Sequence, residues 1–108
     1  MKISEIIKKQ IADNPIILYM KGNPQFPMCG FSAAVVDALQ STGCEFASIN
    51  VLEEPRIRAG LPEVSEWPTF PQLFVAGELV GGADIIKEMN ASGQLKTLVE
   101  TVSPVATE

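Results

Sequence analysis

One strand–loop–helix–strand segment constrains the fold of this chain more than any other feature. Residues 16–20 read Ile-Ile-Leu-Tyr-Met, a continuous apolar run typical of a central strand covered on both faces. A loop rich in helix-breaking residues, 21–28, separates this run from an amphipathic helical pattern at 30–42, which Gly43 is placed to end. Residues 46–51 predict the next strand. Together they indicate a parallel, right-handed βαβ unit.

Patterns on either side of this unit predict the remaining elements. A helix at 3–13 precedes the unit and ends at Asn14-Pro15. The elements that follow are a short helix at 56–61 with Pro55 in its first turn, strands at 72–76 and 79–80 joined around Gly77-Glu78, a helix with Ile85, Ile86 and Met89 on one side, and a final helix carrying Leu95 to Val102. The order αβαβαββαα predicts an α/β, thioredoxin-like fold, with a central mixed four-stranded sheet flanked by helices.

Length and charge limit the organisation and the partners. We expect 108 residues to form a single domain, 1–108, with a short flexible tail from about residue 103. A net charge of −5 argues against nucleic acid or an anionic membrane surface as a general partner. The longest clean apolar stretch is too short to span a bilayer, and the N-terminus lacks the apolar region of a signal peptide. We therefore expect a cytoplasmic protein.

The chain has two cysteines and no histidine, which points to thiol chemistry. Histidine-based catalysis and imidazole metal sites are excluded by composition. About a dozen helical residues lie between Cys29 and Cys44, which places them roughly 18 Å apart or more. A disulfide needs Cα atoms within about 7 Å, so we expect the two not to pair. We interpret Cys44 as a small apolar residue before a strand, with an intermolecular role left open.

Cys29 falls between the central strand and the first turn of the following helix. Free N–H groups of that turn and the helix dipole both favour a thiolate there, and the thiolate is the form that attacks disulfides and binds iron. The alternative is a buried structural cysteine, which a loop position disfavours. Ser32 stands where a dithiol reductase carries its resolving cysteine. We interpret Ser32 as an ordinary polar residue of the first helical turn.

Four motifs together resemble the monothiol glutaredoxins with a CGFS active site, in their short single-domain bacterial form. The similarity runs from about Asn14 to Leu98. The motifs are Tyr19-Met20-Lys21-Gly22, Cys29-Gly30-Phe31-Ser32, Trp67-Pro68-Thr69-Phe70-Pro71-Gln72-Leu73 and Gly81-Gly82-Ala83-Asp84. One tetrad alone is a weak signal, whereas four in matching order and spacing are specific.

The resemblance implies a groove for glutathione, a small anionic tripeptide. Lys21 and Arg58 resemble the family's partners for its glycyl carboxylate, although without the other motifs they are ordinary surface cations. The Phe70-Pro71 bond resembles the family's cis peptide, which turns the Phe70 backbone outward to pair with an extended peptide. Ala83 and Asp84 resemble the positions that take the γ-glutamyl end. For Asp84 a purely structural place, at the N-cap or in the first turn, stays open. We interpret Trp67 as a packing residue and not as a chemically active one.

The resemblance also implies a [2Fe–2S] cluster. Such a cluster needs four ligands, usually thiolates, and each chain offers one competent cysteine, Cys29. Two chains and two glutathione thiols complete the set, so the family's glutathione-bridged homodimer is implied, with a BolA-family protein and apo iron–sulfur acceptor proteins as further partners. Many relatives carry cysteine where this chain has Ala83, so a second redox step through that position is excluded here.

Two other functions remain open on sequence alone. A glutathione-dependent oxidoreductase would remove glutathione from mixed disulfides with one cysteine, because a second glutathione replaces the resolving thiol. A thioredoxin-like binding module with an inert cysteine would require Cys29 to titrate as an ordinary thiol. The long loop at 22–28 resembles the carrier subgroup, so we favour iron–sulfur carriage over enzymatic turnover.

Overall fold

A mixed sheet with strand order β2-β1-β3-β4 organises the chain. The computed structural model describes residues 1–102, so the tail expected from about residue 103 lies outside the described residues. β1 (Ile16–Met20) pairs in parallel with β2 (Ala47–Asn50) and antiparallel with β3 (Gln72–Val75), and β4 (Glu78–Gly81) extends the sheet beyond β3. The βαβ unit and the mixed four-stranded sheet are confirmed.

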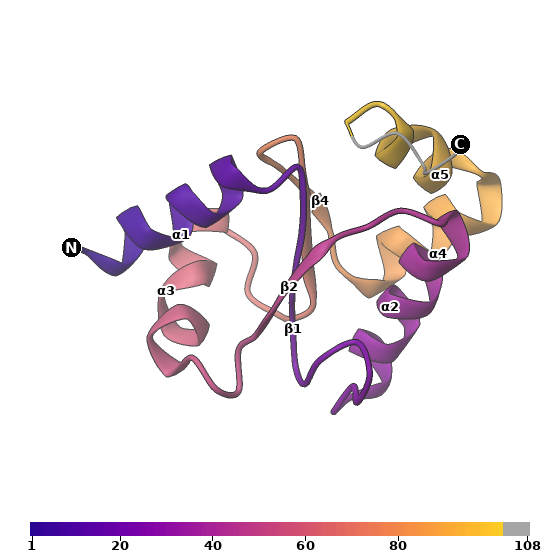
Figure 1. Cartoon of the computed structure of the whole chain (residues 1–108). Coiled ribbons are helices and arrows are strands. Elements are labelled where there is room, and N and C mark those ends of the chain that lie inside the picture. The colour runs from indigo at the N-terminus through magenta and orange to yellow at the C-terminus, as the bar shows by residue number, and fades with distance from the viewer. Residues whose placement is uncertain (103–108) are drawn as a thin grey trace.

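Helices cover both faces of the sheet (Figure 1). α1 (Ile3–Asp13) and α3 (Pro55–Ser65) lie on one face, and α2 (Gly30–Thr42), α4 (Ala83–Ser92) and α5 (Gln94–Glu100) lie on the other. The element order is the expected αβαβαββαα, and the fold is thioredoxin-like. No helix in residues 1–102 is long and apolar enough to cross a membrane.

The central strand β1 divides the core into two parts. All five of its residues are buried, as its continuous apolar run predicts. Because side chains alternate along a strand, Ile16, Leu18 and Met20 pack with α2, α4 and α5, whereas Ile17 and Tyr19 pack with α1 and α3. The strand is therefore held rigidly from both sides, and so is the start of the loop that follows it.

α3 is longer than the predicted helix at 56–61. It continues through Pro62 to Ser65, although an interior proline removes one backbone hydrogen bond. Ile57 and Leu61, one turn apart, are both buried against α1, and Gly60 lets the two helices approach closely at Ile3. Tertiary packing of this face outweighs the local penalty at Pro62.

The predicted hairpin turn was displaced by one residue. The turn residues are Ala76 and Gly77, with φ of 55° and 83°, and Glu78 already belongs to β4, opposite Val75. Two consecutive positive φ angles define the type I′ turn, whose twist matches that of the flanking strands. β2 is one residue shorter at each end than the predicted 46–51.

Two expectations for α4 are settled by its packing. Asp84 lies in the first turn and Gly82 is the N-cap, so Asp84 does not cap the helix. Ile86 is buried and Met89 packs against the core, but Ile85 is 38% exposed. The expectation that Ile85 shares their side was wrong, because it faces the pocket described below.

Candidate functional site

Cys29 is the N-cap residue of α2. Its backbone is extended (φ −155°, ψ 152°), and its Sγ accepts a hydrogen bond from the Ser32 N–H at 3.3 Å. The sulfur thus replaces the side-chain oxygen that usually caps a helix, and it accepts a hydrogen bond from an N–H of the first turn that has no partner within the helix. The thiol is partly exposed, and both cysteines are free. The position predicted for Cys29 at the helix start is confirmed.

Ser32 contacts the same sulfur through its side chain. Its Oγ lies 3.4 Å from Cys29 Sγ and accepts a hydrogen bond from the Lys21 backbone N–H at 3.1 Å. Since that N–H is the donor to Oγ, the hydroxyl proton is free to point at a thiolate. Ser32 is fully buried, which the interpretation as an ordinary polar residue missed. Its place at the third helical position, where capping-box side chains turn back to the N-cap, was the available signal.

These contacts determine the protonation of the thiol. Partial burial raises the pKa of Cys29, but hydrogen bonds from the Ser32 hydroxyl and from the Ser32 and Phe31 amides lower it, and the Lys21 charge lowers it further. The net pKa lies below the ordinary thiol value. A larger fraction of Cys29 is therefore thiolate near neutral pH, which is the reactive and metal-binding form.

A Ser32→Ala variant is expected to raise the pKa of Cys29, because it removes a hydrogen bond that lowers it. Alkylation of Cys29 by iodoacetamide, measured across pH, reports the thiolate fraction. The variant should react more slowly than wild type at mildly acidic pH. Well above the thiol pKa the order should reverse slightly, because a thiolate of higher pKa is the better nucleophile.

The matched control is Ser41→Ala, a serine at the other end of α2 whose Oγ bonds Ala38 O and Asn90. It should leave the alkylation profile unchanged. If the Ser32→Ala profile also superimposes on that of the wild type, the hydroxyl does not act on the thiol.

Asn50 ties the loop before Cys29 to the segment that leads into α3. Its Oδ1 accepts hydrogen bonds from the N–H groups of Gly22 and Leu52, each at 3.0 Å. The loop carrying Lys21 and the turn before α3, which carries Arg58, are thereby held side by side. Sequence reasoning did not single out Asn50, because its two partners lie in different segments of the chain.

A pocket of about 750 Å³ is lined by Phe31, two residues after Cys29 in the first turn of α2, whereas Cys29 itself is not among its lining residues. Five residues expected to bind a ligand all line it: Lys21, Arg58, Phe70, Ala83 and Asp84. The remaining lining residues are Phe31, Pro62, Trp67, Pro68, Thr69, Pro71, Gly82 and Ile85. The fold thus brings together, from four separate segments, residues that the sequence linked only through resemblance.

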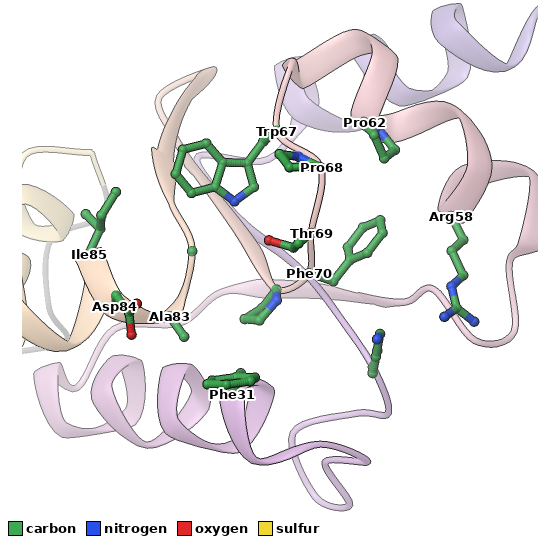
Figure 2. A pocket seen from close by; sticks show the side chains of 13 residues that line it. Phe31, Arg58, Pro62, Trp67, Pro68, Thr69, Phe70, Ala83, Asp84 and Ile85 are labelled. Carbon is green, nitrogen blue, oxygen red and sulfur yellow. The ribbon is translucent and has the colours of Figure 1, made fainter.

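The pocket carries opposite charges at its two ends. Figure 2 shows Arg58 on α3 at one end and Asp84 at the start of α4 at the other. Arg58 and Asp84 are exposed, and Lys21 is half-buried. An elongated ligand with an anionic end and a cationic end matches this arrangement. The first turn of α4 also offers free N–H groups beside Asp84.

The segment between α3 and β3 forms one wall of the pocket. The Phe70–Pro71 peptide is cis, as the resemblance implied. Within the described residues, neither the N–H nor the C=O of Phe70 makes a hydrogen bond. An unpaired backbone edge beside a pocket is able to add an extended peptide as a further strand.

Comparison with known proteins identifies the family. The family model described as Glutaredoxin matches residues 16–80. This chain belongs to the glutaredoxin family. It is 54% identical over 103 residues to Glutaredoxin 4 of Pasteurella multocida, covering 95% of this chain and 94% of the relative. Glutaredoxin 4 of Escherichia coli is 56% identical over 96 residues, covering 89% and 84%.

A solved structure of similar sequence supports the same assignment. Reduced apo GrxS14 from poplar is 44% identical, with a TM-score of 0.79, and the match covers 93% of this chain and 92% of that one. With Ser32 three residues after Cys29 and curated relatives named Glutaredoxin 4, this is a glutaredoxin of the monothiol, single-domain bacterial type.

In this glutaredoxin the second cysteine lies away from the pocket. The 13 residues of α2 separate Cys29 from Cys44, roughly 20 Å at about 1.5 Å per residue. The Cys44 thiol contacts Leu39 O at 3.7 Å and packs against the core. As expected, the two cysteines do not pair, so no resolving thiol is available within residues 1–102.

Three exposed apolar side chains lie within three residues of Cys29 along the chain of the glutaredoxin. Phe26 is 74% exposed, Met28 66% and Phe31 64%. They come from the loop before Cys29 and from the first turn of α2, and we refer to them as the apolar rim. Exposed large apolar side chains gathered at one place are typical of a surface that contacts another molecule.

Proposed function

We propose that this glutaredoxin binds glutathione in the pocket and uses Cys29 to hold a [2Fe–2S] cluster between two chains for transfer to acceptor proteins. The observation that carries the proposal is a thiol of lowered pKa at the N-terminus of a helix whose first turn, through Phe31, lines a pocket of opposite end charges. In this proposal residues 1–108 act as one glutaredoxin domain, and the free thiols suit a reducing, cytoplasmic compartment.

Glutathione matches the chemistry of the pocket from end to end. Its glycyl carboxylate would lie between Lys21 and Arg58. Its cysteinyl backbone would pair with the unpaired backbone of Phe70, as an added strand. Its γ-glutamyl ammonium would meet Asp84, and the carboxylate of the same end would meet the free amides at Ala83 and Asp84. This orientation would leave the ligand thiol in the middle of the pocket, whose lining includes Phe31 of the helix that Cys29 caps.

Ligand counting supports a cluster shared between chains. The chain has no histidine, and no group of three or more cysteine, aspartate and glutamate residues within 1–102 is placed to hold a metal. Cys29 is the one activated thiol. Two copies of Cys29 and two glutathione thiols supply the four thiolates that a [2Fe–2S] cluster requires. Here the cluster is cargo, and thiols held without covalent bonds suit its release.

The apolar rim supports association around the thiol. Burying Phe26, Met28 and Phe31 against a second chain would remove apolar area from water next to both Cys29 residues. We propose a homodimer in the cluster-bound state, and exchange of one chain for a BolA-family protein or an acceptor protein at the same surface.

Anaerobic reconstitution with iron, sulfide and glutathione tests this function. We expect visible charge-transfer absorption and elution as a dimer on gel filtration. Omitting glutathione should abolish both, because half of the thiolate ligands are then missing. A colourless monomer under every condition would contradict cluster carriage. Robust turnover in a mixed-disulfide assay would then favour the alternative, deglutathionylation by one cysteine.

A further inference from the structure

The pocket wall at residues 67–70 lacks the hydrogen bonds of regular structure. It belongs to no helix or strand, and its backbone makes no backbone–backbone hydrogen bond within the described residues. The Trp67 N–H donates to Ser65 Oγ at 3.2 Å. Something else must therefore hold this wall in the conformation that faces the pocket.

The side chain of Gln72 supplies that connection. Its Nε2 donates to Trp67 O at 2.9 Å and to Thr69 O at 3.1 Å. Both partners are carbonyl oxygens, so the amide nitrogen, and not its oxygen, faces the wall. Gln72 is the first residue of β3, it is fully buried, and it lies opposite Tyr19 of the rigid central strand.

The oxygen of the Gln72 amide lowers the stability of the fold. Its Oε1 is buried and makes no hydrogen bond within the described part of the chain. A buried acceptor without a donor destabilises the fold, whereas an apolar side chain of similar length has no such penalty. This cost offsets part of the stability that the two hydrogen bonds of Gln72 contribute, so stability alone does not account for the buried amide. What Gln72 adds is a pair of hydrogen bonds to the pocket wall.

We propose that Gln72 is a positioning residue for the ligand pocket: its buried amide holds the Trp67 and Thr69 carbonyls inward and so presents the free backbone edge of Phe70 to an extended peptide ligand. This inference rests on the proposed glutathione site. Gln72 acts through the wall, without touching the ligand or Cys29. It therefore sets affinity for the ligand and leaves the reactivity of the thiol unchanged.

Gln72→Met is the principal test variant. It keeps the length of the side chain and removes both hydrogen bonds. We expect its Kd for reduced glutathione, measured anaerobically by calorimetry, to rise roughly tenfold, as the loss of two modest hydrogen bonds implies. Its Tm should stay close to that of wild type, because the loss of two hydrogen bonds and the removal of the unpaired acceptor act in opposite directions. The iodoacetamide alkylation rate of Cys29 and its pH profile should not change.

Two companion measurements separate positioning from simple packing. Backbone order parameters measured by NMR at Thr69 and Phe70 should fall in Gln72→Met while those in the β3–β4 hairpin stay the same. Gln72→Glu removes the donors and places a carboxylate against two carbonyls, so it should bind glutathione more weakly still. Gln94→Met, at an exposed position of α5, is the matched control and should behave as wild type.

The outcomes distinguish this inference from the proposed function. If wild type binds glutathione and Gln72→Met binds it equally well, the positioning role is overturned and the pocket assignment stands. Weaker binding that merely follows a lowered Tm also overturns the role, because it indicates a packing defect. If wild type does not bind glutathione, both proposals fail.

Discussion

A Cys29→Ser variant is expected to lose all of the visible absorption and all of the dimer that the wild type acquires on reconstitution. Serine is isosteric, but its hydroxyl does not ionise near neutral pH and cannot replace the thiolate as a ligand to iron. Absorption of the reconstituted variant should fall to that of a protein-free control. Anaerobic reconstitution followed by gel filtration measures both losses.

The fold should survive this substitution. Cys29 is a partly exposed N-cap residue, and serine is among the preferred N-cap residues, so the free energy of unfolding should change by less than about 1 kcal/mol. Cys44→Ser is the control for thiol content and should retain the absorption and the dimer. Cluster assembly by Cys29→Ser, or its loss in Cys44→Ser, would show that the ligand set is wrong.

Gly22→Ala is expected to lower the free energy of unfolding by about 2–4 kcal/mol, in two contributions. Gly22 has φ of 91°, which an alanine adopts only with strain. An added Cβ would also lie 2.5 Å from Phe26 O and 2.6 Å from Met28 N, both backbone atoms of the loop before Cys29. The loop must therefore shift. Urea unfolding measures the change.

Gly77→Ala isolates the first contribution, the strain of a positive φ. Gly77 also has positive φ, 83°, but nothing lies within 4 Å of the position of its Cβ. Gly77→Ala should lose only about 1 kcal/mol and should keep wild-type alkylation of Cys29. Gly22→Ala should in addition alkylate more slowly at mildly acidic pH, since the shifted loop carries Lys21. Equal losses in the two variants would mean that the loop accommodates the methyl group.

Local patterns predicted the segment that carries the thiol. The bounds of α1, β1 and α2 agree with those expected, and Gly43 ends α2 in the left-handed conformation. Their signals are an apolar run, a breaker loop and a glycine, each of which acts within one or two turns of the chain. For the same reason the sequence alone placed Cys29 at the start of a helix, with the electrostatic consequence for its thiolate.

Signals that depend on distant residues were misinterpreted or missed. The predicted helix stopped before Pro62 because propensity counts the lost hydrogen bond and does not count the packing of Leu61 against α1. Ile85 was assigned to the core side of α4, because its neighbours are apolar, but it borders the pocket. The end of α3 and the side on which Ile85 lies both depend on which residues the fold places next to these side chains.

The sequence by itself determined the thiol, its helix and the absence of a resolving partner, while the tertiary structure alone decided how the site is assembled. The resemblance predicted which five residues bind the ligand, and the structure brings their four segments together around one pocket. The buried contacts of Ser32 and Gln72 had no local signature beyond position. A hydrogen bond becomes decisive only when burial removes water as the alternative partner, and burial is a property of the whole fold.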